Sequence, residues 1–237
     1  MDAPHPLDRP IWSALTTRQR GLARGGPDAL RFDPDHALFA ATRDGSPESL
    51  AALATLAPAE GTIGLVEIDE PPVPSGLIQV SSALCDQMVA DRVAGRAADA
   101  AIVPLGDGDA AEMLALATLT KPGPFFARTH RLGNFVGVKI DGRLAAMAGE
   151  RMKIDGFTEV SGVCTHPDHR GRGYAAALMA HVARAILARG ETPFLHSYSD
   201  NQGANALYAR MGFRLRQQVI FTQLANPEAF ANLRAGL

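Results

Sequence analysis

VSGVCTHPDHRGRGYAAALM, residues 160–179, contains the end of an apolar strand pattern, a glycine-rich loop and the start of a helical pattern. The strand cannot continue past Pro167, because proline has no N–H group to donate to a sheet ladder. The loop Arg170-Gly171-Arg172-Gly173 follows, and apolar residues with helical spacing begin directly after it. The segment therefore predicts a junction in which a strand leads through a tight loop into a helix.

A loop of this composition can bind an anion. Gly171 and Gly173 permit a tight turn in which backbone N–H groups point into one concavity. The first turn of the helix adds unsatisfied N–H groups and the positive end of its dipole, which together suit a pyrophosphate. Arg170 and Arg172 would add charge at the rim. Taken alone, the loop also fits an ordinary turn before an amphipathic helix.

The segments around this junction alternate between strand and helix patterns. Asp141-Gly142 predicts a two-residue hairpin between two of the strands, and Gly190 suits the left-handed end of the long helix. Leu178, Val182, Ala185 and Ile186 are expected on the buried face of that helix. The expected strands are 101–105, 135–140, 143–152, 157–165, 192–197 and 213–224, and the expected helices are 110–119, 127–132, 173–189 and 204–211.

Residues 159–213 resemble the GCN5-related N-acetyltransferase (GNAT) superfamily, and most closely its FR47-like subgroup. The family's first motif, R/Q-x-x-G-x-G/A, is matched by Arg170, Gly173 and Ala175. Its second motif, N-x-x-A-x-x-L-Y-x-x-x-G-F, is matched by Asn201, Ala204, Leu207, Tyr208, Gly212 and Phe213. Two motifs in the right order are more specific than either alone, and the upstream strands extend the resemblance to about residues 100–224.

This resemblance implies an α/β (α+β) fold of the GNAT type, in which a central mixed, mostly antiparallel and splayed sheet is flanked by helices. We expect an acetyltransferase domain at 99–237 and an extra N-terminal α/β lobe at 1–98. In that lobe, Ser46-Pro47-Glu48 predicts the start of a helix that runs to Leu56, and 61–68 and 77–81 read as strands. The lobe could be a diverged copy of the same fold, a substrate-facing cap or a dimerisation element, and its strands favour the first.

The resemblance further implies an N-acetyltransferase that moves an acetyl group from acetyl-CoA to a primary amine by direct attack on the thioester. The alternative is a non-catalytic module that binds CoA or an acyl-CoA for regulation. Acetyl-CoA would be the co-substrate, and no metal is expected. The acceptor could be a small-molecule amine, an amino acid or a protein N-terminus, and a homodimer is compatible with the sequence.

The family's cofactor-binding positions carry over to three segments. Backbone groups around Cys164 would bind the pantetheine arm, although ordinary ladder pairing is the alternative for Val163 and Thr165. Asn201 would bind the pantetheine region, and it also fits a helix N-cap. The expected cofactor-binding residues are Val163, Cys164, Thr165, Arg170, Gly171, Arg172, Gly173, Tyr174, Ala175, Asn201 and Ala204.

Two side chains are expected to carry the chemistry. Tyr208 matches the family's proton donor to the leaving thiolate, and the alternative is a tyrosine at the edge of the core. Glu159 lies eleven residues before Arg170, the spacing at which histone-type relatives place their catalytic glutamate, and it is the expected general base, with a pKa raised by partial burial. The alternative is an exposed strand carboxylate. The N–H group of Val163 or Cys164 would stabilise the oxyanion.

Composition excludes several other classes. A net charge of −2 does not favour nucleic acid as a partner, and no stretch approaches the roughly 20 apolar residues of a membrane span. Cys85 and Cys164 form no CxxC pair, and the N-terminus lacks a signal-peptide pattern, so a cytoplasmic location is expected. Cys164, His166 and His169 do not have the spacing of a usual zinc site.

Overall fold

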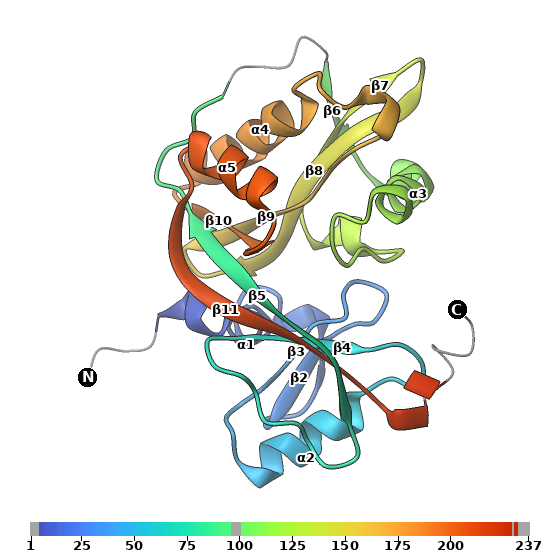
Figure 1. Ribbon diagram of the computed structural model, residues 1–237, viewed down its shortest axis with the longest axis vertical. Helices are drawn as coiled ribbons and strands as arrows, with labels where there is room; N and C mark the ends of the chain where they lie inside the picture. The colour runs from blue at the N-terminus through green and yellow to red at the C-terminus, as the bar shows by residue number, and fades with distance from the viewer. Residues whose placement is uncertain (1–4, 96–100, 229, 232–237) are drawn as a thin grey trace. The chain divides into compact units, whose positions relative to one another are not determined.

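The computed structural model describes residues 5–95, 101–228, 230 and 231, and these divide into two compact units (Figure 1). The first unit contains Met1–Pro34, Leu38–Asp86 and Gln217–Leu237, and the second contains Asp35–Ala37 and Gln87–Arg216. The boundary predicted between residues 98 and 99 lies outside the described residues and stays a prediction. The strand Arg214–Ala225, predicted within the C-terminal domain, contributes most of its length to the first unit.

The second unit is built on a mixed, mostly antiparallel sheet with the order β10-β9-β8-β7-β6, as the predicted fold class requires. Only β10 and β9 pair in parallel among these neighbours. The predicted hairpin is confirmed, since Asp141 and Gly142 have φ values of 49° and 77°, the left-handed conformation that such a turn needs. The strands are β6 Ile102–Leu105, β7 Phe135–Ile140, β8 Arg143–Ile154, β9 Phe157–Thr165 and β10 Thr192–Tyr198.

Helices cover both faces of this sheet. The long helix α4 packs on Ala146, Ala148 and Val160, whereas α3 shares a separate apolar cluster with Met147 and Cys164. Successive strand residues point to opposite faces, so the two helices lie on opposite sides of β8. The helices are α3 Ala110–Thr120, α4 Tyr174–Ala188 and α5 Gln202–Arg210, with a short 3-10 turn at Thr129–Leu132.

One residue on the predicted apolar face of α4 lies elsewhere. Leu178, Val182 and Ile186 are buried as expected, but Ala185 is exposed. The buried face also includes Met179 and Ala183, so its centre is rotated away from Ala185.

The first unit contains a small antiparallel sheet, β1-β2-β3, and a second set of strands in which β11 lies between β4 and β5. The predicted helix at Ser46 is confirmed as α2, whose N-cap Ser46 accepts a hydrogen bond from the Ser49 N–H group. Helix α1 and strands β1 and β2 were not predicted, because such short segments carry no clear periodicity. The elements are α1 Pro10–Thr16, α2 Pro47–Leu56, β1 Ala23–Gly25, β2 Ala29–Phe32, β3 Ala40–Thr42, β4 Ile63–Glu67, β5 Ile78–Val89 and β11 Arg214–Ala225.

Two features of β9 shape the site. A bulge against β8 falls at Gly162, whose φ of +64° favours glycine. On the other edge, the register between β9 and β10 ends where Glu159 pairs with Phe194. The two strands separate beyond this pair, which is the splay that the resemblance predicts.

We expect Gly149→Ala to destabilise the second unit. A Cβ atom at this position would lie 2.3–2.6 Å from ring atoms of Phe135, which is buried and meets Phe125 edge to face. Overpacking of this kind costs about 1–3 kcal/mol, and thermal unfolding measures it. Gly203→Ala is the matched control, because nothing lies within 4 Å of its added Cβ and alanine favours helix α5. Equal melting temperatures for Gly149→Ala and wild type would contradict this packing.

Candidate functional site

A cavity of about 430 Å³ lies in the second unit, between the end of β9 and the start of α4. The predicted cofactor residues of the strand and the loop all line it. They are Val163, Cys164, Thr165, Arg170, Gly171, Arg172, Gly173, Tyr174 and Ala175. The volume is within the usual range for a small-molecule site.

The loop forms an open cradle at the start of α4. Gly171 and Gly173 have φ values of 76° and 78°, and nothing lies within 4 Å of a Cβ built on either. Gly173 is the N-cap of α4, and no side-chain hydrogen bond caps this end of the helix. The N–H groups of the first turn therefore face the loop without a side-chain partner, which is the arrangement that binds phosphate groups.

Two residues that line this cavity carry buried polar atoms with no hydrogen-bond partner in the described part of the chain. These atoms are Thr165 Oγ1 and His169 Nδ1. Buried polar atoms are normally satisfied, so their presence here indicates a position where a ligand or water supplies the partner. Burial raises the pKa of the Cys164 thiol to about 11 despite a hydrogen bond with Thr120, so this thiol stays protonated at neutral pH.

The structure also adds residues to the site that the motifs do not contain. Thr120 and Pro122 line the cavity from the end of α3, where Lys121 adopts a left-handed conformation. His169, Ala176 and Leu207 complete the lining. His169 and Ala176 directly flank the motif, whereas no sequence signal connects Thr120 with the glycine loop.

The predicted residues of α5 do not line this cavity, although Leu207 does. Asn201 is the N-cap of α5, and its side chain accepts a hydrogen bond from the Ala204 N–H group, so the N-cap alternative is confirmed. Tyr208 packs with its ring near Phe213, at a centroid distance of 6.4 Å, and burial raises the pKa of its phenol above the ordinary 10.0. Tyr208 is therefore protonated at neutral pH.

The surroundings of Glu159 differ from both sequence predictions, the general base and the exposed strand carboxylate. The residue is 0% exposed, and both carboxylate oxygens accept hydrogen bonds from Arg151, at 2.7 and 2.8 Å. His196 Nδ1 lies 2.8 Å from Glu159 Oε1. Burial by itself raises the pKa of Glu159, but the charge of Arg151 and these hydrogen bonds outweigh it and lower the pKa to about 2. A fully buried carboxylate of such low basicity is poorly suited to the predicted role of general base.

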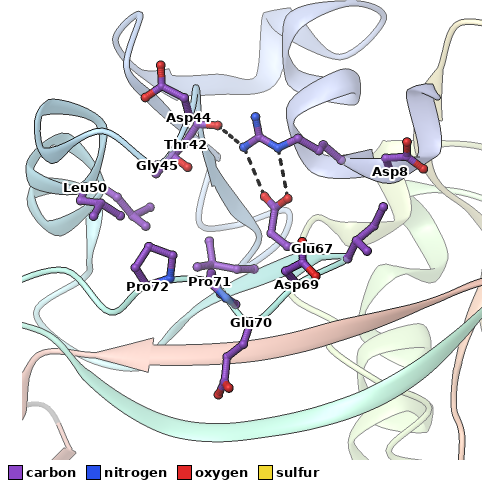
Figure 2. Close-up of a pocket in the computed structure, with 14 residues that line it drawn as sticks. Asp8, Thr42, Asp44, Gly45, Leu50, Glu67, Asp69, Glu70, Pro71 and Pro72 are labelled. Carbon is purple, nitrogen blue, oxygen red and sulfur yellow. Dashed lines mark hydrogen bonds and ion pairs between the residues drawn. The ribbon is translucent and has the colours of Figure 1, made fainter. Parts of the chain in front are cut away.

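A second cavity, of about 410 Å³, lies within the first unit (Figure 2). Arg9 lines it and donates hydrogen bonds to Glu67, at 3.1 and 3.3 Å, and to the carbonyl oxygen of Thr42. Burial raises the pKa of Glu67, an effect that Arg9 partly offsets. The other charged residues of the lining are the carboxylates Asp8, Asp44, Asp69 and Glu70.

The two cavities differ in their suitability for a phosphate group. The start of α2 borders the second cavity, and there the Asp44 carboxylate already accepts hydrogen bonds from the Ser46 N–H and the Ser49 hydroxyl. An internal carboxylate thus occupies the positive end of this helix, and the surrounding acids would repel another anion. Of these two cavities, the one at α4 combines a bare helix start with nearby arginines, so it fits a nucleotide cofactor better.

No helix of the described chain is long and apolar enough to cross a membrane. Among the same residues, no three His, Cys, Asp or Glu side chains gather as a metal site.

Comparisons with known proteins agree with this geometry. The FR47-like protein family model matches residues 135–222. A solved structure from Novosphingobium aromaticivorans, assigned to the GNAT family as an acetyltransferase, is 44% identical, with a TM-score of 0.87 over 94% of this chain and 99% of that one. A GCN5-related N-acetyltransferase from Kribbella flavida is 20% identical, with a TM-score of 0.64 over 91% and 95% of the two chains, and shows the same fold.

No protein of curated function matches the sequence significantly. The identity and coverage of the Novosphingobium structure, together with the glycine cradle at α4, show the family. The chain is a member of the GNAT family of acyltransferases.

Proposed function

We propose that the protein is an N-acetyltransferase that moves an acetyl group from acetyl-CoA to a primary amine. The observation that carries the proposal is the uncapped start of α4 beside the separated edge of β9, in a cavity that contains unpaired Thr165 Oγ1 and His169 Nδ1. Family membership supports acyl transfer in general. The choice of acetyl-CoA and of an amine rests on the family's usual chemistry.

Residues along the cavity would hold the cofactor. The N–H groups from Gly171 to Ala175 would bind the pyrophosphate, and Arg170 and Arg172 would add positive charge. Backbone groups of Val163, Cys164 and Thr165 would bind the pantetheine arm, where β9 has no parallel partner. Asn201 and Ala204 would support this region through the start of α5, which their hydrogen bond fixes. When bound, the thioester supplies an activated acyl group.

The chain's own groups would then serve the transfer. Attack by an amine places negative charge on the thioester oxygen, and the N–H group of Val163 or Cys164, at the Gly162 bulge, is the proposed donor to it. Tyr208 would give its proton to the departing sulfur as the C–S bond breaks, because its raised pKa keeps the phenol protonated. The proton that the amine loses would return to the tyrosinate through solvent water. Glu159 remains the sequence's candidate for the base, but its burial points to another role.

The proposal also covers the acceptor, the cellular location and the first unit. A small amine, an amino acid and a protein N-terminus remain the acceptor classes of this proposal, with no nucleic acid or membrane partner. We propose a cytoplasmic protein, since Cys85 and Cys164 are both free and buried. The first unit is proposed to be a diverged lobe, because α2 packs on its strands in an apolar cluster that joins Leu53 with Ile63 and Leu224. A homodimer is compatible with this assignment.

Gly173→Glu should abolish CoA binding. The new side chain puts a carboxylate into the cradle and forces a residue with a Cβ to adopt a φ of +78°. We expect at least about a hundredfold weaker binding by calorimetry, since charge repulsion and lost hydrogen bonds act together. Gly142→Glu is the matched control, because its φ is +77° and it lies in the β7–β8 hairpin. Equal weakening by both variants would mean that strain, and not the cradle, is responsible.

Tyr208→Phe should lower kcat by about 10²-fold between pH 7 and 9, as expected when a general acid is lost. Release of free thiol from acetyl-CoA would be followed with a panel of alkylamines, amino acids and peptides. The affinity for CoA should not change. Because burial raises the phenol pKa above 10.0, the loss of its acid form should begin only at still higher pH.

Tyr198→Phe, at an exposed position of β10, should keep the wild-type rate. Full activity of Tyr208→Phe at every pH would refute the assignment of Tyr208 as the proton donor. A wild-type protein that binds CoA but releases no thiol with any amine would instead support the non-catalytic alternative.

A further inference from the structure

A continuous line of buried and partly buried polar side chains crosses the sheet at the level where β9 and β10 separate. Arg151 of β8 donates to Glu159 of β9, and His196 of β10 lies 2.8 Å from Glu159. On the other side, His196 Nε2 lies 3.1 Å from Gln87 Nε2 of β5, and Arg216 of β11 donates to Gln87 Oε1 at 2.8 Å. These five strands are adjacent in the order β11-β5-β10-β9-β8, and all five residues belong to the second unit. We call them the transverse ladder.

The ladder meets β9 at an irregular point. Glu150 pairs with Val160 and Lys153 with Thr158, so Arg151 and Met152 both face Glu159. This is a bulge, with two residues opposite one. The Glu159 carboxylate lies near both, because it accepts from Arg151 and, at 3.4 Å, from the Met152 N–H group.

The ladder meets β10 just beyond the last paired residue. Phe194 is the last residue of β10 in register with β9, and its partner is Glu159. Two residues later, on the same face of the strand, His196 reaches back to the Glu159 carboxylate. A side-chain contact therefore continues the link between the strands where the backbone ladder has ended.

The donors and acceptors of the ladder fix the state of His196. Since Gln87 Oε1 accepts from Arg216, the other end of this amide is a donor, and His196 Nε2 must accept from it. The proton of the neutral ring then lies on Nδ1 and is donated to Glu159. Neither ring nitrogen is left to accept a proton from a substrate. Glu159 and Gln87, on either side of the partly buried His196, are both 0% exposed.

We propose that the transverse ladder is a positioning device that holds β9 and β10 at their point of separation, and that Glu159 acts through it and not as the general base. The inference rests on the proposed function, because the gap between these strands is where the pantetheine arm would bind. Loss of a member would let the strands shift, and the backbone groups of Val163–Thr165 would no longer match the cofactor.

The test compares Glu159→Gln with Gln87→Met in the full-length protein. Gln87 is an amide that cannot act as a base, yet it connects His196 to Arg216. The ladder predicts that both variants weaken CoA binding on the order of tenfold in calorimetry, as expected when a supporting hydrogen bond is lost. The KM for acetyl-CoA should rise in parallel, with a smaller change in kcat and an unchanged shape of the pH–rate profile for the best amine of the panel.

Gln218→Met, an identical substitution at an exposed position of β11, should bind CoA like wild type. The proposal would be overturned if both variants bound CoA with wild-type affinity and Glu159→Gln alone lost kcat, by about 10²-fold or more, together with the acidic limb of the pH–rate profile. That result would identify Glu159 as the base. If Glu159→Gln does not fold, because Arg151 is left without its anion, the CoA affinity of Gln87→Met decides alone.

The wild-type protein alone tests the proposed function, separately from the transverse ladder. A wild-type protein that binds no CoA would refute the function itself, before any variant is compared.

Discussion

The first turn of α4 presents backbone N–H groups that no side chain of the described chain caps, and the rest of the site is arranged around them. Gly171 and Gly173 take left-handed conformations to bring the chain into this turn, and β9 ends directly before it. An anion stabilises a bare helix start through the unsatisfied N–H groups and the positive end of the helix dipole. The loop is therefore best explained by a ligand with phosphate groups, which agrees with membership of the GNAT family.

In the first unit, by contrast, side chains of the protein itself cap the N–H groups at the start of a helix. At α2 the Asp44 carboxylate and the Ser46 side chain satisfy the helix start, and the charged residues that line the cavity beside it are all acids except Arg9 (Figure 2). A helix after a short strand is thus not enough to form a cofactor site. The difference between the two units is one of electrostatics and capping, and it gives a reason why acyl-CoA would bind at α4 and not at α2.

Much of the second unit could be predicted because its signals are local. Asp141-Gly142 indicates a hairpin, Pro167 ends a strand, and Gly190 ends α4, each through the backbone conformation that the residue permits. The position of Glu159 on β9 was predictable in the same way, but its complete burial and its pairing with Arg151 were not. Its partners Arg151 and His196 lie on β8 and β10. A bulge and the separation of two strands bring them to Glu159, and neither feature produces a periodic sequence pattern. Thr120 likewise reaches the cavity only through the packing of α3.

If the backbone from β9 into α4 binds the nucleotide cofactor, amide hydrogen exchange with and without CoA should detect it. CoA is expected to slow exchange in peptides that cover residues 163–176 and to leave peptides that cover residues 42–50 of the first unit unchanged. Slower exchange confined to residues 42–50, or no change at 163–176 at saturating CoA, would contradict it.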